Sequence, residues 1–345
     1  MSRFRALAAL AVGTALVLTG CAGTSAAPGA QEGSSTSATG SFPVTIDHAF
    51  GETTIEAEPK RVVTVSWGNQ EAALALGVVP VAMPKVTWGD EDGDGMLPWV
   101  KDKLDELGAE TPTLMDETDG FDYEAIADAK PDVILGAYSG MTQEQYDTLS
   151  KIAPVVAYPE IAWGTSWQQM TLTDAKALGR EDQAQQLVGD LEKHVTDESA
   201  KYPALAGKKT LFTYLDPTDL STLGYYSLKD PRALYLSELG MTPSSAVETS
   251  SKDSETFWFT QSTENIESFS DVDVMVGYGT PELLAQLQSD PLWSRIPAIK
   301  NGAFAALTDN TTIAAAANPS PLSIGTSFGD EYIALVGAAA EKAGQ

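Results

Sequence analysis

The sequence predicts an α/β protein of two lobes, each built on a parallel sheet, joined by a single long α-helix and separated by a cleft. Three observations predict this fold. Short apolar stretches typical of buried strands alternate with helical stretches in both halves of the chain. The stretch between the halves, residues 165–202, has a helical pattern and contains no proline. About 300 residues follow the N-terminal leader, a length that favours two domains.

Residues 1–20 have the pattern of a signal peptide. Two arginines precede an apolar run over residues 6–18, which is shorter than a transmembrane helix. Thr19 and Gly20 stand directly before Cys21, the one cysteine of the chain. This pattern resembles the lipobox of bacterial lipoproteins, which implies lipidation of Cys21 and a protein held on the extracytoplasmic face of the cell membrane. Alternatively, Cys21 is incidental to an ordinary secretory signal that is cleaved elsewhere.

Residues 21–41 are mostly Ala, Gly, Ser and Thr and predict a flexible tether. By random-coil scaling its average reach is about 25 Å. The formal net charge of −27 excludes nucleic-acid binding, because a nucleic-acid reader carries the opposite sign. We therefore expect contact with the membrane through the lipid anchor only.

The N-terminal lobe (N-lobe) is expected over residues 42–164. Alternating residues at 44–47 and 53–56, with Gly51 at the turn, predict a β-hairpin. Strands are predicted at 61–65, 78–82, 132–135 and 155–157, and helices at 70–76, 123–129 and 143–150. Because strands and helices alternate, we expect a parallel sheet with helices on both faces.

The C-terminal lobe (C-lobe), residues 203–345, repeats this pattern. Strands are predicted at 210–214, 272–276 and 303–306, and helices at 232–239, 281–288 and 328–340. Between the lobes, the predicted helix over residues 165–202 carries an apolar stripe formed by Leu187, Val188, Leu191 and Val195. Pro203 ends it, and Gly179 is the residue that could divide it into two helices.

Five stretches carry a resemblance to a known family, and their order and spacing are more specific than any one of them. They are residues 59–63, 71–81, 97–100, 123–134 and 318–324. With the two lobes and the lipid tether, they resemble the ABC-transporter substrate-binding proteins for ferric siderophores, haem and cobalamin. The resemblance implies a monomer without enzymatic activity that delivers its cargo to an ABC permease. It also implies no protein cofactor, since the siderophore itself coordinates the iron.

The same resemblance assigns two surface glutamates to permease docking. In this family one glutamate on each lobe enters an arginine pocket of the permease. The N-lobe motif, an acidic residue in the helix before the Lys-Pro-Asp strand, falls on Glu124. The C-lobe motif, Ser-x-Glu before a strand, falls on Glu264. Without the motif, either residue would be interpreted as part of a solvated helix face.

Ligand-binding residues are expected just after the strands, because sites in open α/β sheets lie at the carboxyl ends of the strands. Aromatic side chains are frequent there. The candidates are Trp67, Trp88, Tyr138, Tyr158, Tyr214, Trp258 and Tyr278. Tyr138 and Trp258 resemble pocket residues of the hydroxamate-siderophore branch. Arg232 is the candidate donor to hydroxamate oxygens, with a surface ion pair to Asp230 or Glu238 as its alternative role.

The sequence leaves several other functions open. Haem or cobalamin are alternative ligands within the same fold, and catecholate siderophores rank below hydroxamates because few basic residues are available. Adjacent tyrosines, Tyr225 and Tyr226, allow direct binding of bare iron as a minor alternative. A surface sensor or an exported lipoprotein enzyme are alternatives of a different class. We expect neither a metal site nor catalysis, because the chain has only two histidines, His48 and His194.

Overall fold

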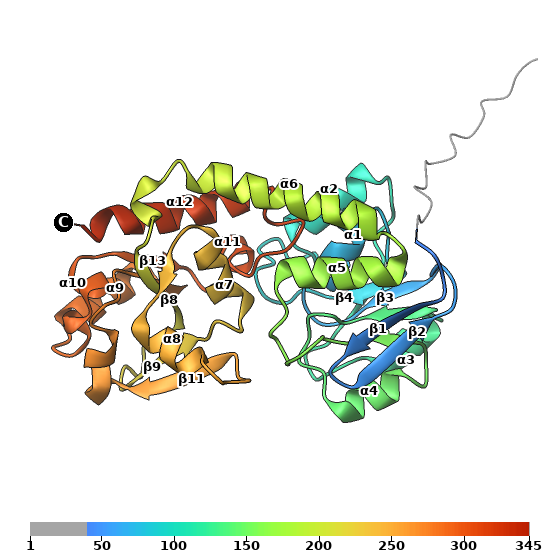
Figure 1. Ribbon diagram of the computed structural model, residues 1–345, viewed down its shortest axis with the longest axis horizontal. Helices are drawn as coiled ribbons and strands as arrows, with labels where there is room; N and C mark the ends of the chain where they lie inside the picture. The colour runs from blue at the N-terminus through green and yellow to red at the C-terminus, as the bar shows by residue number, and fades with distance from the viewer. Residues whose placement is uncertain (1–39, 345) are drawn as a thin grey trace, which may run out of the picture. The chain divides into compact units, whose positions relative to one another are not determined.

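Two separate β-sheets, one in each half of the chain, organise the protein (Figure 1). The structure is a computed structural model that describes residues 40–344. The predicted signal peptide, Cys21 and the tether up to residue 39 lie outside the described residues. Within the described part, no helix combines the length and the apolar character that crossing a membrane requires.

The N-lobe sheet is parallel, in the order β5-β4-β3-β6-β7. Its strands are β3 (Val62–Thr64), β4 (Ala82–Pro84), β5 (Thr113–Met115), β6 (Val133–Leu135) and β7 (Val155–Val156). Its helices are α1 (Asn69–Ala75), α2 (Pro98–Glu106), α3 (Tyr123–Asp128) and α4 (Gln143–Leu149). The predicted hairpin is present as β1 (Val44–His48) and β2 (Gly51–Ile55).

The strand predicted at 78–82 begins later than expected. Val78 donates its backbone N–H to Ala73 and so belongs to the end of α1. Pro80 has no N–H to give to a neighbouring strand, so regular pairing starts at Ala82, opposite Val63. The apolar run therefore predicted that a strand is present here, but not the residue at which its pairing begins.

The C-lobe sheet is mixed rather than parallel, with the order β11-β9-β8-β12-β13. Its strands are β8 (Lys209–Tyr214), β9 (Thr222–Tyr226), β10 (Thr242–Pro243), β11 (Trp258–Ser262), β12 (Val274–Tyr278) and β13 (Phe304–Leu307). Strands β8, β12 and β13 are parallel, as predicted, but β9 is antiparallel to β8 and to β11. Neither β9 nor β11 was predicted: β9 follows β8 after a short loop without a crossover helix, and β11 pairs with the outer side of β9.

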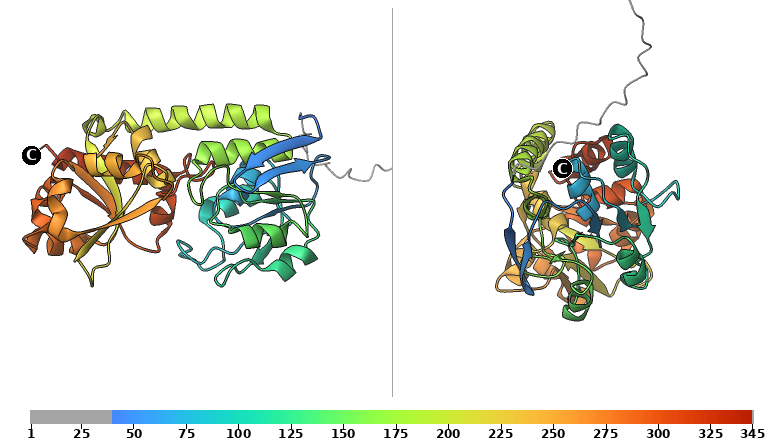
Figure 2. Two further views of the ribbon diagram at one scale, coloured as in Figure 1. Left: turned by 60° about the horizontal axis from the view of Figure 1, so that its bottom comes forward. Right: turned by 90° about the vertical axis from the view of Figure 1, so that its right-hand side faces the viewer.

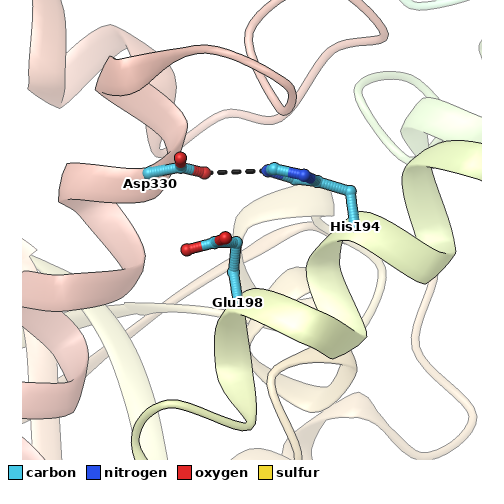
Figure 3. Close-up of side chains that lie close together, drawn as sticks. All are labelled: His194, Glu198 and Asp330. Atoms are coloured by element: carbon cyan, nitrogen blue, oxygen red, sulfur yellow. Dashed lines mark hydrogen bonds and ion pairs between the residues drawn. The ribbon is translucent and has the colours of Figure 1, made fainter.

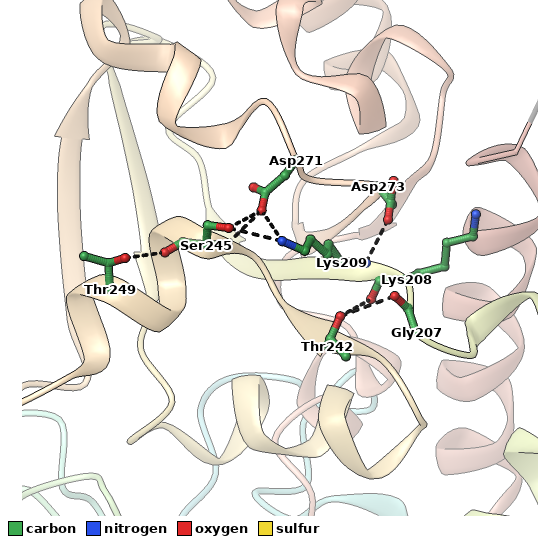
Figure 4. A network of polar contacts seen from close by, with 8 residues as sticks. All are labelled: Gly207, Lys208, Lys209, Thr242, Ser245, Thr249, Asp271 and Asp273. Atoms are coloured by element: carbon green, nitrogen blue, oxygen red, sulfur yellow. Dashed lines mark hydrogen bonds and ion pairs between the residues drawn. The ribbon is translucent and has the colours of Figure 1, made fainter.

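Short helices surround this sheet. They are α7 (Pro231–Glu238), α8 (Ser245–Ser251), α9 (Pro281–Ser289), α10 (Pro297–Lys300), α11 (Thr312–Ala316), α12 (Ser327–Lys342), and the 3₁₀ turns η1 (Pro203–Leu205), η2 (Thr263–Phe269) and η3 (Trp293–Arg295). At the amino ends of β8 and β12, Lys209 Nζ bonds Asp271 at 2.7 Å and Ser245 at 3.1 Å (Figure 4). The backbone N–H of Lys209 donates to Asp273 at 2.9 Å. This polar network holds the end of the sheet that lies away from the carboxyl ends.

The predicted single helix over residues 165–202 is two helices, α5 (Trp167–Leu178) and α6 (Glu181–Ser199). Gly179 separates them with φ 66°, a left-handed conformation that ends a helix at little cost only in glycine. Helix α6 connects the lobes, since it contacts α5 on the N-lobe side and α12 on the C-lobe side (Figures 1 and 2). His194 on α6 bonds Asp330 on α12 at 2.8 Å (Figure 3).

Part of the C-terminal half packs on the N-lobe. Ala315 and Ala316 of α11 share an apolar cluster with Leu74 and Trp99. The buried carboxylate of Glu71 on α1 accepts hydrogen bonds from Trp99 Nε1 at 2.6 Å and from the Ser320 hydroxyl. The chain therefore crosses between the lobes after β13 as well as through α6.

Candidate functional site

A cavity of about 400 Å³ lies where the carboxyl ends of strands from both sheets meet. Seven of its ten lining residues are aromatic. They are Trp67, Trp88, Tyr138, Trp163, Tyr214, Phe257 and Tyr278, and the others are Arg232, Asp309 and Asn318. Both lobes contribute, so the cavity belongs to the cleft between them.

Pairing of β3 with β6 explains why two N-lobe aromatics meet. Thr64 is paired with Leu135, and Trp67 and Tyr138 each follow three residues later. The buried Asn69 amide connects their loops: its Nδ2 donates to the carbonyl of Tyr138 at 2.9 Å, and its Oδ1 accepts the N–H of the same residue at 3.0 Å. Asn69 is a positioning residue that the sequence did not reveal.

Trp88 links the aromatics of the two lobes. Its ring lies 6.1 Å from that of Trp67 and 5.4 Å from that of Tyr278, measured between centroids, and both pairs are edge-to-face. Its indole N–H donates to Asp309 Oδ1 at 3.1 Å. One side chain after β4 thus contacts the last residue of β12 and a residue that follows β13.

Tyr138 is 4% exposed and sits between two further lining residues. Its ring is edge-to-face with Trp163 at 5.2 Å, and its hydroxyl accepts a hydrogen bond from Asn318 at 3.2 Å. Burial raises the pKa of Tyr138 above its ordinary value, so the phenol stays neutral. Gly140 permits this packing, since a Cβ there would lie 2.1 Å from Trp163 Nε1.

On the C-lobe side, Tyr214 and Tyr278 end the paired strands β8 and β12 and lie opposite one another in register. Tyr278 is buried, whereas Tyr214 is 48% exposed at the mouth of the cavity. Burial also raises the pKa of Tyr278. The pair provides one covered and one open aromatic surface.

Arg232 lines the cavity and is also ion-paired with Asp230, although this pair is buried and not on the surface as expected. Its Nε and Nη2 bond the two carboxylate oxygens of the buried Asp230 at 2.8 and 2.7 Å. The guanidinium carbon lies 3.9 Å from the ring centroid of Tyr226. Burial opposes the charge of Arg232, but Asp230 and Tyr278 outweigh it and raise the pKa of Arg232. Arg232 also hydrogen-bonds Tyr278, so its guanidinium is held beside the cavity by partners on two sides.

Six of the eight predicted ligand-binding residues line this cavity: Trp67, Trp88, Tyr138, Tyr214, Arg232 and Tyr278. The lining residues that sequence reasoning missed include Asp309 and Asn318. Asn318 opens the stretch 318–324 that carried the family resemblance, and this signal could have revealed it. Asp309 follows β13 in a loop without a recognisable motif.

The structure places Tyr158 and Trp258 elsewhere. Tyr158 follows β7, the edge strand, and packs against Phe50 with ring centroids 5.2 Å apart. Trp258 packs on Tyr226 at 4.7 Å and covers Gly224, where a Cβ would lie 2.1 Å from its ring. Adjacent residues of an extended chain face opposite sides, so Phe257 reaches the cavity and Trp258 does not.

Two groups of side chains in the described part of the chain gather possible metal ligands. They are His194, Glu198 and Asp330 (Figure 3), and Asp90, Asp92 and Asp94. Neither group lines the cavity, and their carboxylates have protein partners: Glu198 pairs with Lys201, and Asp94 with Lys101. The two glutamates expected at a permease, Glu124 and Glu264, are exposed in the first turns of α3 and η2.

Comparison with known proteins agrees with this geometry. The model of the periplasmic binding protein family matches residues 62–311. A probable siderophore-binding lipoprotein of Bacillus subtilis (strain 168), YfiY, is 32% identical over 273 residues, which cover 75% of this chain and 78% of the relative. The Fe(3+)-citrate-binding protein YfmC of the same organism is 24% identical over 263 residues, or 73% of this chain and 74% of that protein.

Among solved structures, PiaA of Streptococcus pneumoniae TIGR4 in complex with ferrichrome has a TM-score of 0.82 and 44% identity, covering 86% of this chain and 99% of PiaA. Staphylococcus aureus SirA, complexed with staphyloferrin B, shares the fold with a TM-score of 0.64 and 23% identity over 87% of this chain and 98% of SirA. The family is one of solute-binding proteins and not of enzymes. The chain belongs to the periplasmic binding protein family.

Proposed function

We propose that this protein captures a ferric siderophore, of the hydroxamate type, and delivers it to an ABC permease for iron uptake. The observation that supports this proposal most directly is the aromatic cavity. Among the described residues that line it, Arg232 is the one with a positive charge. A ferric hydroxamate has an organic periphery and oxygen acceptors around an iron already coordinated by the ligand. Aromatic rings pack the periphery, and Arg232 donates to the oxygens. The ferrichrome complex of PiaA supports the same cargo class.

The proposal includes a division of the whole chain. Residues 1–20 are the signal peptide and 21–41 the tether, with lipid on Cys21 holding the protein at the extracytoplasmic face of the membrane. Residues 42–164 and 203–345 are the lobes, and 165–202 connect them. The protein acts as a monomer, and Glu124 and Glu264 contact the permease.

The test of the cargo is a fluorescence titration of protein that starts after Cys21. Ferric hydroxamates, ferric catecholates, haem and cobalamin are added separately, because Trp67, Trp88 and Trp163 line the cavity and report its occupancy. We expect saturable quenching by a ferric hydroxamate and none by its iron-free form. Saturation by haem or cobalamin alone would show that this ligand, and not a siderophore, is the cargo. If none of the four ligands quenches the fluorescence, the proposal is rejected.

Two matched variants show whether the cavity is the binding site. Trp88→Phe removes an indole from the cavity, and we expect weaker binding by about tenfold or more, as for a buried aromatic anchor. Trp258→Phe makes the same change outside the cavity and leaves affinity unchanged. Equal effects of the two variants would place the ligand elsewhere.

The docking assignment is tested by the double variant Glu124→Ala with Glu264→Ala. Both side chains are exposed and outside the cavity, so ligand affinity stays the same. We expect loss of ferric siderophore uptake in cells that depend on this protein. Loss of ligand binding in the double variant would contradict the assignment.

A further inference from the structure

A second compartment of about 180 Å³ adjoins the aromatic cavity. The two share Trp67, Trp88 and Trp163 in their linings. The polar side chains of the compartment include Gln70, Lys85 and Glu117. A molecule in the cavity can therefore extend an arm past the three indoles into this compartment.

Two of the residues that line this compartment each have a buried side-chain oxygen without a hydrogen-bond partner. These atoms are Oε1 of Gln70, a residue 3% exposed, and Oε1 of Glu117. The other carboxylate oxygen of Glu117, Oε2, accepts the backbone N–H of Ser66 at 2.9 Å. That bond holds one oxygen of the carboxyl group and leaves the second oxygen without a donor. Buried acceptors without donors are uncommon in folded proteins, and both of these become satisfied if a ligand supplies the donor.

The chemistry of the lining selects a positively charged donor. A carboxylate forms its strongest hydrogen bonds with a cationic N–H group, and the faces of nearby indole rings also attract cations. The charged groups next to Glu117 are Lys85 and Asp116, both exposed. Within the described residues, Lys85 forms no ion pair with Glu117. Burial raises the pKa of Glu117 to about 7, so this carboxyl group can take up or release a proton near neutral pH.

We propose that Glu117 and Gln70 form a subsite for an ammonium-bearing arm of the ferric siderophore. The inference rests on the function proposed above and narrows it to hydroxamates that carry a free amine. Glu117 accepts two hydrogen bonds in the complex, one from Ser66 and one from the ligand. Gln70 accepts a further N–H of the same ammonium group.

The test compares two probes with the same iron-hydroxamate core. Ferrioxamine B ends in a primary ammonium group, and its N-acetyl derivative ends in a neutral amide. We expect the protein to bind the amine form about tenfold more tightly, as one buried charged hydrogen bond allows. This preference increases from pH 6 to pH 8, because the ionised form of Glu117 is the form that binds the ammonium group.

Glu117→Gln keeps an oxygen for the Ser66 N–H but removes the charge. We expect this variant to bind both probes with the affinity that the wild type shows for the acetylated one, without the pH dependence. Asp116→Asn is the matched control, because it removes the same charge from the neighbouring exposed residue and keeps the preference.

Equal affinity of the wild-type protein for the two probes would overturn the subsite while leaving the proposed function intact. Weaker binding of both probes by Glu117→Gln, in equal proportion, would also overturn it and assign Glu117 to holding the Ser66 turn. If neither probe binds while haem or cobalamin does, both the subsite and the hydroxamate function are rejected.

Discussion

The two lobes bury acidic side chains in different ways. In the C-lobe, Asp230 is 0% exposed and forms two hydrogen bonds with the guanidinium of Arg232. On the N-lobe side, Glu71 and Asp174 are equally buried, and no cation pairs with either among the described residues. The first arrangement keeps a charge pair beside the cavity, whereas the second favours neutral carboxyl groups.

The sequence around Asp230 explains the C-lobe arrangement. Asp230 caps helix α7 by accepting the backbone N–H of Arg232 at 2.9 Å, and Pro231 provides the first helical residue. The cap and the ion pair therefore involve the same two residues, two positions apart. A local motif therefore places both members of the ion pair next to each other.

The N-lobe acids have no such local partner. Burial raises the pKa of Glu71 to about 7, although hydrogen bonds from Ser320 and Trp99 oppose the shift. Burial raises the pKa of Asp174 well above its ordinary value, and neither of its oxygens has a hydrogen-bond partner. Burial without a nearby cation therefore raises the pKa of both N-lobe acids.

The largest expected effect comes from breaking the C-lobe pair. Asp230→Ala leaves Arg232 as a buried charge without its partner and removes the cap of α7. We expect the free energy of unfolding to fall by about 3–5 kcal/mol, the usual cost of breaking a buried pair. Urea unfolding measures this loss. Affinity for a ferric hydroxamate should fall too, because the guanidinium is no longer held toward the cavity.

Asp230→Asn is the matched control, since it keeps a capping oxygen but removes the charge. Its loss of stability should be smaller than that of the alanine variant. If Asp230→Ala has the same free energy of unfolding as the wild type, the ion pair does not stabilise the protein. The proposed difference between the buried acids of the two lobes would then be wrong.

A smaller effect is expected from Asp174, and it depends on pH. The unfolded chain releases this proton near the ordinary pKa of 3.8, whereas the folded chain retains it. The folded state therefore binds more protons, so the contribution of Asp174 to stability is fully present below pH 3.8 and is lost as the pH rises. Each pH unit costs about 1.4 kcal/mol while only the unfolded form is ionised. Asp174→Asn should remove this slope between pH 5 and pH 7.

The measurement is the free energy of unfolding in urea at pH 5 and pH 7 for wild type and variant. Glu71→Gln is the companion variant. It should remove the loss of stability with rising pH that Glu71 causes. That loss stops near pH 7, because the pKa of Glu71 is about 7 in the folded protein. An Asp174→Asn variant with the same pH dependence as the wild type would show that this carboxyl group is ionised when folded.

The sequence predicted the parts of the site that follow from local pattern. Trp67, Tyr138 and Tyr278 were found because each follows or ends a buried strand, and strand ends of a parallel sheet converge. Arg232 was a candidate because, in the family that the sequence resembles, a Pro-Arg entry to a helix often faces the cleft, and the structure places it in the cavity lining. The order of short motifs along the chain was enough to indicate the family.

What the sequence did not show depends on contacts between distant residues. Trp88 and Asp309 are 221 positions apart, and no local pattern connects them. The positioning role of Asn69 appears only once β3 and β6 are paired. Tyr158 does not line the cavity, and order along the chain does not reveal that the strand before it, β7, is at the edge of the sheet.

The smallest expected effect concerns α6, which joins the two lobes. Gly189 is exposed within this helix, and a Cβ there would meet no atom within 4 Å. Gly189→Ala should raise the free energy of unfolding by about 0.5–1 kcal/mol, because alanine loses less conformational entropy in a helix. The gain should be the same at pH 5 and pH 7, since no charge changes.

Ligand affinity tests whether the lobes must move against each other at this helix. If α6 acts as a stiff rod, Gly189→Ala leaves the affinity for a ferric hydroxamate unchanged. Gly179→Ala is the contrasting variant, because φ is 66° there and the added Cβ is strained, so stability should fall instead. A change in affinity with Gly189→Ala would mean that α6 bends during binding. The Arg232 side and the aromatic N-lobe side would then close on the ligand rather than form a preset cavity.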